Sequence, residues 1–104
     1  MNRVAFKMKL KKGCEAEYKK RHDEIWPELK SLLRDQGVLD YGIYLDEETG
    51  TLFAVQKVRG DQGSQDLGRN PIVKKWWHYM SDIMDTNPDE SPVTTPLKEV
   101  FYIE

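Results

Sequence analysis

One histidine of this chain is flanked by aromatic residues at the spacing of a helix. Tyr18, His22 and Trp26 are four residues apart, and a rotation of about 100° per residue places them on one side of a helix. Ile25 and Leu29 fall on the same side. Histidine is the side chain best suited to give and take protons near neutral pH. This helix face therefore predicts a small pocket for an uncharged, hydroxyl-rich or flat ligand, with His22 as general acid and base.

A second interpretation of His22 stays open at this point. A buried histidine whose ring makes one hydrogen bond is a common component of a protein core. Tyr18 and Trp26, one turn to either side, favour the functional interpretation, because a phenol can relay protons while the rings stack against a ligand.

Three more aromatic residues are candidates for ligand binding. Tyr41 is expected on a strand near the first helix, where it could equally be an ordinary cross-strand aromatic residue. Trp76 and Trp77 are adjacent on a helix and diverge by about 100°, so one could line a pocket while the other edges it or reaches a subunit contact. Sugars present flat C–H faces that stack on indoles, and the indole N–H can donate to a hydroxyl.

The elements that would position these residues alternate between strands and helices. Alternating apolar residues predict strands, and apolar residues three or four apart predict helices. Pro27 should kink the first helix or split it and open its second half. The expected elements are a strand at 4–10, a helix at 14–36, a hairpin of strands at 41–45 and 51–58, a loop or frayed helix start at 60–70, a helix at 71–84, an irregular segment at 87–96 and a strand at 98–103.

This order predicts an α+β fold of the ferredoxin-like βαββαβ type, with one antiparallel sheet and both helices on one face. The 104 residues suffice for one compact domain, 1–104, and not for two. Apolar residues such as Val55 and Phe101 would lie on the face without helices. We therefore expect a covering partner, most economically a second copy of the chain in a homodimer.

Composition excludes several classes of protein. The net charge is −2, so no basic face is expected to bind nucleic acid, and no apolar run is long enough to span a membrane. Cys14 is the single cysteine and can form neither an intrachain disulfide nor a cysteine-based metal site. No phosphate loop and no cluster with metal-ligand spacing is present, so no cofactor or metal is expected. The N-terminus lacks the apolar segment of a signal peptide, and we expect a cytoplasmic location.

Five motifs together resemble one known family. They are Y-x-x-x-H-x-x-I-W-P-E-L at 18–29, Y-x-I-Y-L-D at 41–46, W-W-x-Y-M-x-D-x-M at 76–84, N-P-D-x-S-P-V at 87–93 and E-V-F-Y at 99–102. In this register the chain resembles the L-rhamnose mutarotase family nearly from end to end. The resemblance implies a dimeric α+β barrel and a cytoplasmic, cofactor-free isomerase that interconverts the α and β anomers of L-rhamnose.

The resemblance also implies roles for single residues. The residue that matches His22 is the family's proton donor, and we hypothesise that it protonates the ring oxygen of the sugar. Tyr18 or a bound water would complete the exchange at the anomeric hydroxyl, and Tyr41 would orient hydroxyl groups. Trp76 and Trp77 would hold the apolar face and the 6-methyl group of the sugar.

One segment departs from the family pattern, and two rival functions remain. Residues 60–70 are glycine-rich where the family usually has a more helical stretch with a tryptophan. This departure leaves the length of the second helix and one wall of the pocket open. The rivals are a cofactor-free oxygenase of the same dimeric barrel class and a non-catalytic sugar-binding module. Oxygen consumption would identify the first, and ligand binding without faster anomer exchange would identify the second.

Overall fold

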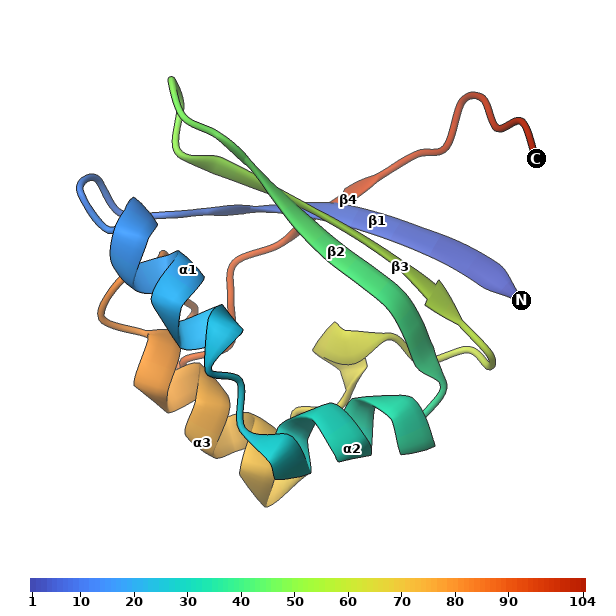
Figure 1. Ribbon diagram of the computed structural model, residues 1–104, viewed down its shortest axis with the longest axis horizontal. Helices are drawn as coiled ribbons and strands as arrows, with labels where there is room; N and C mark the ends of the chain where they lie inside the picture. The colour runs from blue at the N-terminus through green and yellow to red at the C-terminus, as the bar shows by residue number, and fades with distance from the viewer.

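The computed structural model describes residues 1–104. Its sheet has the order β2-β3-β1-β4, and each neighbouring pair is antiparallel. All three α-helices lie on one side of this sheet (Figure 1), as predicted for the ferredoxin-like α+β fold, which is confirmed. The elements are β1 (Asn2–Lys9), α1 (Glu15–Asp23), α2 (Pro27–Asp35), β2 (Val38–Asp46), β3 (Thr51–Val58), a 3₁₀ helix η1 (Ser64–Asp66), α3 (Pro71–Met80) and β4 (Thr95–Leu97).

Proline and glycine set the ends of the helices. Pro27 is the first residue of α2, where its missing N–H costs no hydrogen bond. The expected helix at 14–36 is therefore split rather than kinked, and residues 24–26 join the two parts. Gly37 follows α2 with φ of +86°, a left-handed conformation that glycine adopts without a steric penalty. The chain then turns directly into β2.

Strand β2 contains a bulge that aims one of the candidate residues. The pairing with β3 shifts between Leu39 and Gly42, and Asp40 within the bulge has φ of 47°. Side chains alternate between the faces of a strand, so residues three apart normally face opposite ways. The extra residue lets Val38 and Tyr41 face the same side, toward the helices.

The core fills the space between the sheet and the helices. Strand β1 contributes Phe6 and Met8, which alternate with exposed lysines as its pattern predicts. Helix α3 contributes more buried side chains than α1 or α2. The buried cluster consists of Phe6, Met8, Leu10, Tyr18, Leu29, Leu52, Ala54, Leu67, Val73, Trp76, Trp77, Met80, Ile83 and Met84.

Helix α3 is shorter than its apolar spacing predicts. It ends at Met80, because the Ser81 hydroxyl donates to the carbonyl of His78 at 2.7 Å and so competes with the next helical hydrogen bond. Met84 is nevertheless buried, and it pairs with Leu10 in an isolated β-bridge. The apolar position was predicted correctly and the helix that carries it was not.

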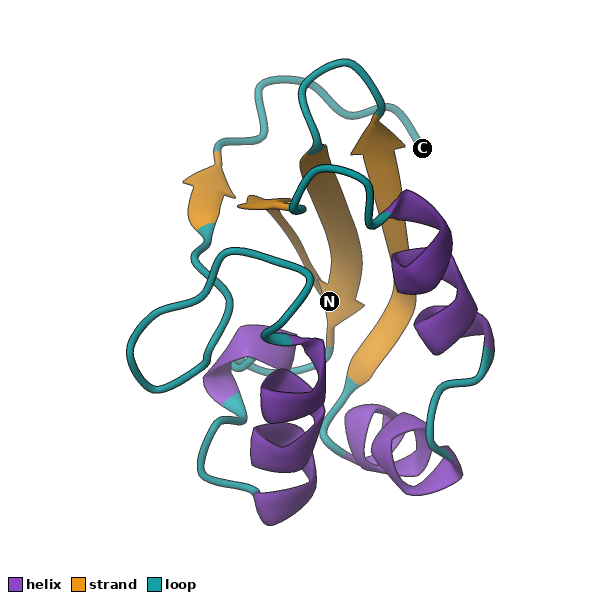
Figure 2. Cartoon of the chain, turned by 90° about the vertical axis from the view of Figure 1, so that its left-hand side faces the viewer, coloured by secondary structure: helices purple, strands orange, loops and turns teal.

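The expected last strand at 98–103 is wrong. The final strand is β4, which pairs with β1 through Leu97, Pro96 and Thr95 only. Every residue after Leu97 is exposed, and the C-terminal tail leads away from this short edge strand (Figures 1 and 2). Alternating apolar residues describe the two faces of a possible strand, but a strand also needs a neighbour with free backbone groups. Beyond the pair of Ala5 with Leu97, the tail contacts β1 through side chains, where Arg3 pairs with Glu99 and lies over the Tyr102 ring, and not through a backbone ladder.

Candidate active site

A cavity of about 1280 Å³ lies between the sheet and the helices. Its lining includes all the residues that the sequence proposed as a site, namely Tyr18, His22, Tyr41, Trp76 and Trp77. They come from α1, β2 and α3, so three elements bring them together. Cavities that bind small molecules typically measure roughly 300–1,000 Å³, and this one has room for a monosaccharide together with water.

His22 is held by the backbone of its own helix. Its Nδ1 lies 3.0 Å from the carbonyl oxygen of Tyr18. A carbonyl can only accept, so Nδ1 carries the proton and donates, which leaves Nε2 of the neutral ring with a free lone pair. Burial lowers the pKa of His22 below its ordinary 6.5, and the Tyr18 carbonyl and Asp23 oppose this shift more weakly. The neutral ring is therefore favoured near pH 7, and its Nε2 can accept a proton.

Aromatic rings surround the imidazole on two sides. The Tyr18 ring lies 4.3 Å from the His22 ring at an interplanar angle of 31°, and Trp76 meets it edge-on at 5.4 Å and 89°. Trp26 packs edge-on against Trp76 at 5.1 Å and is absent from the cavity lining. Trp26 therefore supports the wall of the cavity from behind rather than forming it.

The phenols of Tyr18 and Tyr41 remain protonated at any physiological pH. Burial raises the pKa of Tyr18 far above its ordinary 10, and the proximity of Tyr41 raises it further. Burial also raises the pKa of Tyr41, while the nearby Ser64 hydroxyl acts in the opposite direction. Both groups can thus donate hydrogen bonds to a ligand, and neither is a general base.

Trp76 and Trp77 both line the cavity. Their exposed fractions are only 8% and 9%, so neither ring is free to reach a subunit contact. Gly68 packs against Trp77, and a Cβ built on Gly68 would lie 2.7 Å from Cζ3 of the indole. The glycine-rich segment 60–70 is therefore a packed wall of the cavity rather than only a loop.

The same segment contributes a polar contact that sequence reasoning missed. The Ser64 backbone N–H donates to Oε1 of Gln56 at 2.8 Å, and Nε2 of Gln56 donates to the Ser64 hydroxyl at 2.9 Å. Ser64 lines the cavity and Gln56 is buried. The alternation of β3 was the available signal, because it puts polar Gln56 on the same face as apolar Ala54 and Val58.

Two expectations about charged and polar residues are corrected by the structure. The cationic run of Lys19, Lys20 and Arg21 is typical of a solvated helix face, but the Arg21 side chain is only 10% exposed and binds Asp82. Asp82 and Asn87 are polar residues whose position in the sequence suggests contacts at the mouth of the cavity, but neither lines it. The reason is that each already has partners, with Asn87 donating to Ser91 and to the carbonyl of Pro92. Sequence spacing could not reveal these partners, because the Arg21 partner lies 61 positions away.

Other chemistry is sparse in this chain. His78 is exposed, and its Nδ1 contacts Glu90 at 2.8 Å. No group of three or more His, Cys, Asp or Glu residues is placed to hold a metal ion. No helix combines the length and the apolar character needed to cross a bilayer. These observations define a ferredoxin-like α+β protein whose one imidazole-containing cavity is walled by phenols and indoles.

Comparison with known proteins narrows this class to one family. The family model for L-rhamnose mutarotase matches residues 3–103. The L-rhamnose mutarotase of Formosa agariphila is 65% identical over 104 residues, and that of Bacteroides thetaiotaomicron 64%, each with both chains covered completely. The chain therefore belongs to the L-rhamnose mutarotase family of anomer-interconverting isomerases, as its motifs indicated.

Solved structures agree with this assignment. The crystal structure of an L-rhamnose mutarotase from Formosa agariphila has a TM-score of 0.93 at 62% identity, with all of both chains covered. A protein of Mycobacterium tuberculosis, Rv0793, has a TM-score of 0.58 at 14% identity, with 98% of this chain covered. The second likeness concerns the fold alone.

Proposed function

We propose that this chain interconverts the α and β anomers of L-rhamnose, with His22 as the general base and acid. The observation that carries the mechanism is the hydrogen bond from Nδ1 of His22 to the Tyr18 carbonyl, which leaves Nε2 unprotonated in a residue that lines the cavity. The names of the relatives support the substrate. Of the rival functions, neither the oxygenase nor the sugar-binding module is favoured by these names.

Mutarotation opens the sugar ring and closes it on the other face of the C1 carbonyl. On opening, the anomeric hydroxyl loses its proton, the bond from C1 to the ring oxygen breaks, and the ring oxygen gains a proton. Neutral His22 accepts the anomeric proton on Nε2 first and then delivers it to the ring oxygen, which is bonded to the same carbon. After rotation about C1–C2, the reverse steps close the ring, and His22 regains its starting state.

The barrier to be lowered is modest, because free sugars already mutarotate in water. General acid–base catalysis by one positioned side chain contributes about 10²–10⁴-fold. Tyr18 and Tyr41, both neutral phenols, donate hydrogen bonds that orient the sugar hydroxyls. Trp76 and Trp77 stack on its apolar face and on the 6-methyl group. In this route the proton that the anomeric hydroxyl gives to His22 is the same proton that His22 gives to the ring oxygen.

The His22→Ala variant tests the proposal. We expect the rate of anomer exchange, followed by NMR saturation transfer on L-rhamnose, to fall by about 10²-fold or more. His78→Ala is the matched control, because His78 is exposed and contacts Glu90. Exchange at the wild-type rate in His22→Ala would refute the role of His22. Spectra with other free hexoses then define the range of sugars accepted.

The assembly and its location are further parts of this proposal. The sheet face without helices exposes Tyr44 (68%) and Val55 (41%), and the tail exposes Phe101 and Ile103. Water contact with so much apolar surface is unfavourable, which supports a homodimer that covers it. Residues 1–104 as a single mutarotase domain and a cytoplasmic location stay predictions.

A further inference from the structure

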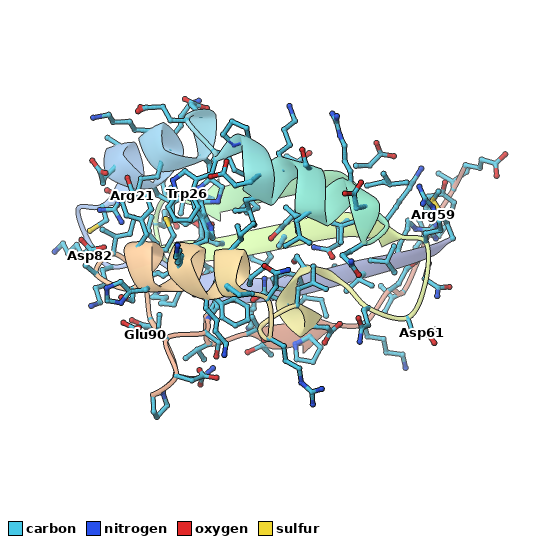
Figure 3. The ribbon with its side chains drawn as sticks, turned by 90° about the horizontal axis from the view of Figure 1, so that it is seen from below. Arg21, Trp26, Arg59, Asp61, Asp82 and Glu90 are labelled. Atoms are coloured by element: carbon cyan, nitrogen blue, oxygen red, sulfur yellow. The ribbon has the colours of Figure 1, made fainter.

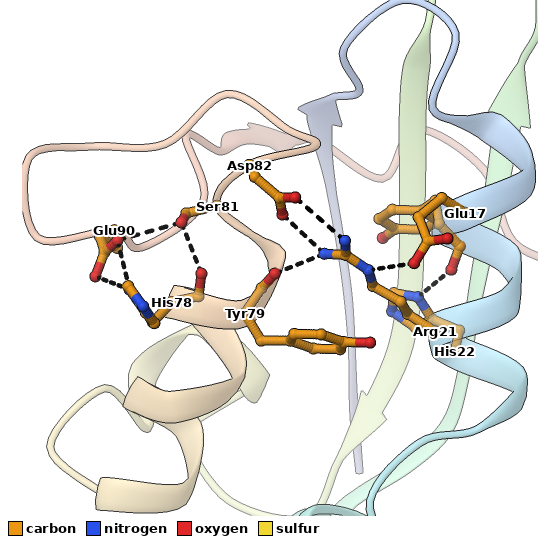
Figure 4. A network of polar contacts seen from close by, with 9 residues as sticks. Glu17, Arg21, His22, His78, Tyr79, Ser81, Asp82 and Glu90 are labelled. Carbon is orange, nitrogen blue, oxygen red and sulfur yellow. Dashed lines mark hydrogen bonds and ion pairs between the residues drawn. The ribbon is translucent and has the colours of Figure 1, made fainter.

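Arg21 joins helix α1 to the end of helix α3. Its Nε donates to Glu17 at 2.7 Å within α1, and Nη1 donates to the Tyr79 carbonyl at 2.6 Å. Nη1 and Nη2 also bind the two carboxylate oxygens of Asp82, at 2.8 and 3.2 Å (Figure 4). Figure 3 shows Arg21, Trp26 and Asp82 gathered at one end of the molecule. A single guanidinium thus connects the two helices that line the cavity.

A series of ring contacts leads from Arg21 back to its neighbour His22. The guanidinium lies 4.4 Å from the centre of the Tyr79 ring, and Tyr79 stacks on Trp26 at 5.7 Å and 27°. Trp26 packs against Trp76, and Trp76 packs against His22. These contacts form a closed circuit, which we call the Arg21 circuit, of Arg21, Tyr79, Trp26, Trp76 and His22. Movement of Arg21 relative to α3 would therefore change the spacing between His22 and Trp76.

Helix α1 has little else to hold it in place. It has nine residues, a single buried side chain, Tyr18, and no side-chain hydrogen bond at its N-cap. A helix this short is marginal alone and depends on tertiary contacts. The ion pair with Asp82 is well suited to supply one, because the Arg21 hydrogen bond holds the pKa of Asp82 below its ordinary 3.8 and the carboxylate stays charged.

We propose that Arg21 is a positioning residue for anomer exchange. By tying α1 to Asp82 and to the Tyr79 carbonyl, it holds Nε2 of His22 at reacting distance from a sugar stacked on Trp76. Arg21 itself does not line the cavity, so it acts through His22 and not on the substrate. The inference rests on the role proposed for His22.

The first test replaces Arg21 with Met, which keeps an unbranched apolar stem and removes the hydrogen bonds of the guanidinium. Misplacement of a catalytic group by about 1 Å can cost on the order of 10²-fold in rate, and we expect kcat to fall by roughly 10–100-fold. KM should change less than about threefold, because Tyr41, Trp76 and Trp77 lie on other elements and, of the proposed sugar contacts, Tyr18 alone moves with α1. Lys20→Met, an exposed cation on the same helix, is the control and should behave as wild type.

The conservative variant Arg21→Lys separates charge from geometry. An ammonium group cannot reproduce the planar fork that binds Glu17, Asp82 and the Tyr79 carbonyl together. We expect kcat between those of Arg21→Met and the wild type. Restoration of full activity by Lys would show that charge alone is needed and would overturn the positioning role.

Asp82→Asn weakens the same connection from the turn that follows α3. Because the Asp82 side chain is 65% exposed, this variant should fold even where Arg21→Met does not. NOE intensities between the ring protons of His22 and Trp76 should weaken in both variants, while those between His22 and Tyr18, on one helix, persist. Unchanged kcat and unchanged NOEs in folded Asp82→Asn would overturn the proposal. A fall in kcat together with a large rise in KM would also overturn it, because that result indicates a general structural defect.

Failure of the underlying role of His22 gives a different result. If His22→Ala keeps the wild-type exchange rate, then His22 is not the proton carrier, whatever Arg21→Met does. If His22→Ala loses exchange and folded Arg21→Met keeps it, then only the proposal for Arg21 is wrong.

Discussion

The chemical state of His22 depends on two neighbours that act in different ways. The Tyr18 carbonyl selects the ring tautomer through Nδ1, and burial favours the neutral ring over the cation. A histidine identified only as a proton donor would need to be charged before each turnover. In the proposed mechanism the neutral tautomer instead accepts a proton first and donates it second, which suits a reaction that returns the base to its starting state.

This tautomer leads to a prediction about pH. Because the pKa of His22 is below 6.5 in the folded chain, kcat/KM should fall as pH drops through the folded pKa and should level off at higher pH. The unfolded chain binds this proton more readily, so the free energy of unfolding should also decrease as pH falls from about 6.5 toward the folded pKa. NMR titration of the imidazole measures the folded pKa. The pH–rate profile, corrected for uncatalysed exchange, measures kcat/KM, and urea denaturation at each pH measures the free energy of unfolding. A midpoint above 6.5 would contradict the burial effect.

At the scale of elements, local irregularities bring the site together. The chain changes direction at the break between α1 and α2, which Pro27 sets. The bulge of β2 at Asp40 changes the direction of the Tyr41 side chain. The segment 60–70 packs closely at Gly63, where a Cβ would lie 2.7 Å from Oε1 of Gln56, and at Gly68 against Trp77. Glycine is therefore required in this wall by close packing, whereas the glycine at residue 60 has open space around it.

Gly68→Ala tests this packing. The added methyl would lie 2.7 and 2.8 Å from two carbons of the Trp77 ring, so the indole or the segment must move. Overpacking of this kind typically costs about 1–3 kcal/mol, and KM for the sugar should rise because Trp77 lines the cavity. Urea denaturation measures the loss of stability. Gly60→Ala, with no atom within 4 Å of the new Cβ, is the control, and equal stability of the two variants would argue against a packed wall.

At the scale of the whole molecule, the two faces of the sheet differ. One face carries the helices, the core and the cavity, while the other exposes residues of β2 and β3 such as Tyr44 and Val55. The exposed tail that follows β4 adds further apolar surface. Exposed apolar surface of this kind is common at protein interfaces, and it supports the homodimer proposed above.

We expect the wild-type chain to sediment as a dimer at micromolar concentration. Val55→Arg should yield a folded monomer, because Val55 is 41% exposed in the single chain and a buried unpaired charge would disfavour the interface. Lys74→Glu, an exposed change on α3, should leave the dimer intact. A wild-type monomer at that concentration would contradict the homodimer.

The sequence by itself determined the features that depend on neighbouring residues. Alternation along β1 and β3, the start of α2 at Pro27 and the helical face shared by Tyr18 and His22 are local properties, because side-chain direction repeats with the backbone geometry. The order of these elements then sufficed for the ferredoxin-like fold, and the motifs sufficed for the family.

Only the tertiary structure decided which distant groups meet. It paired Arg21 with Asp82, placed Ser64 on Gln56, ended α3 at Met80 and left the tail after Leu97 without a strand partner. The physical reason is that hydrogen bonds and ion pairs depend on distances in space. Residues 61 positions apart carry no periodic signal of such contacts along the chain.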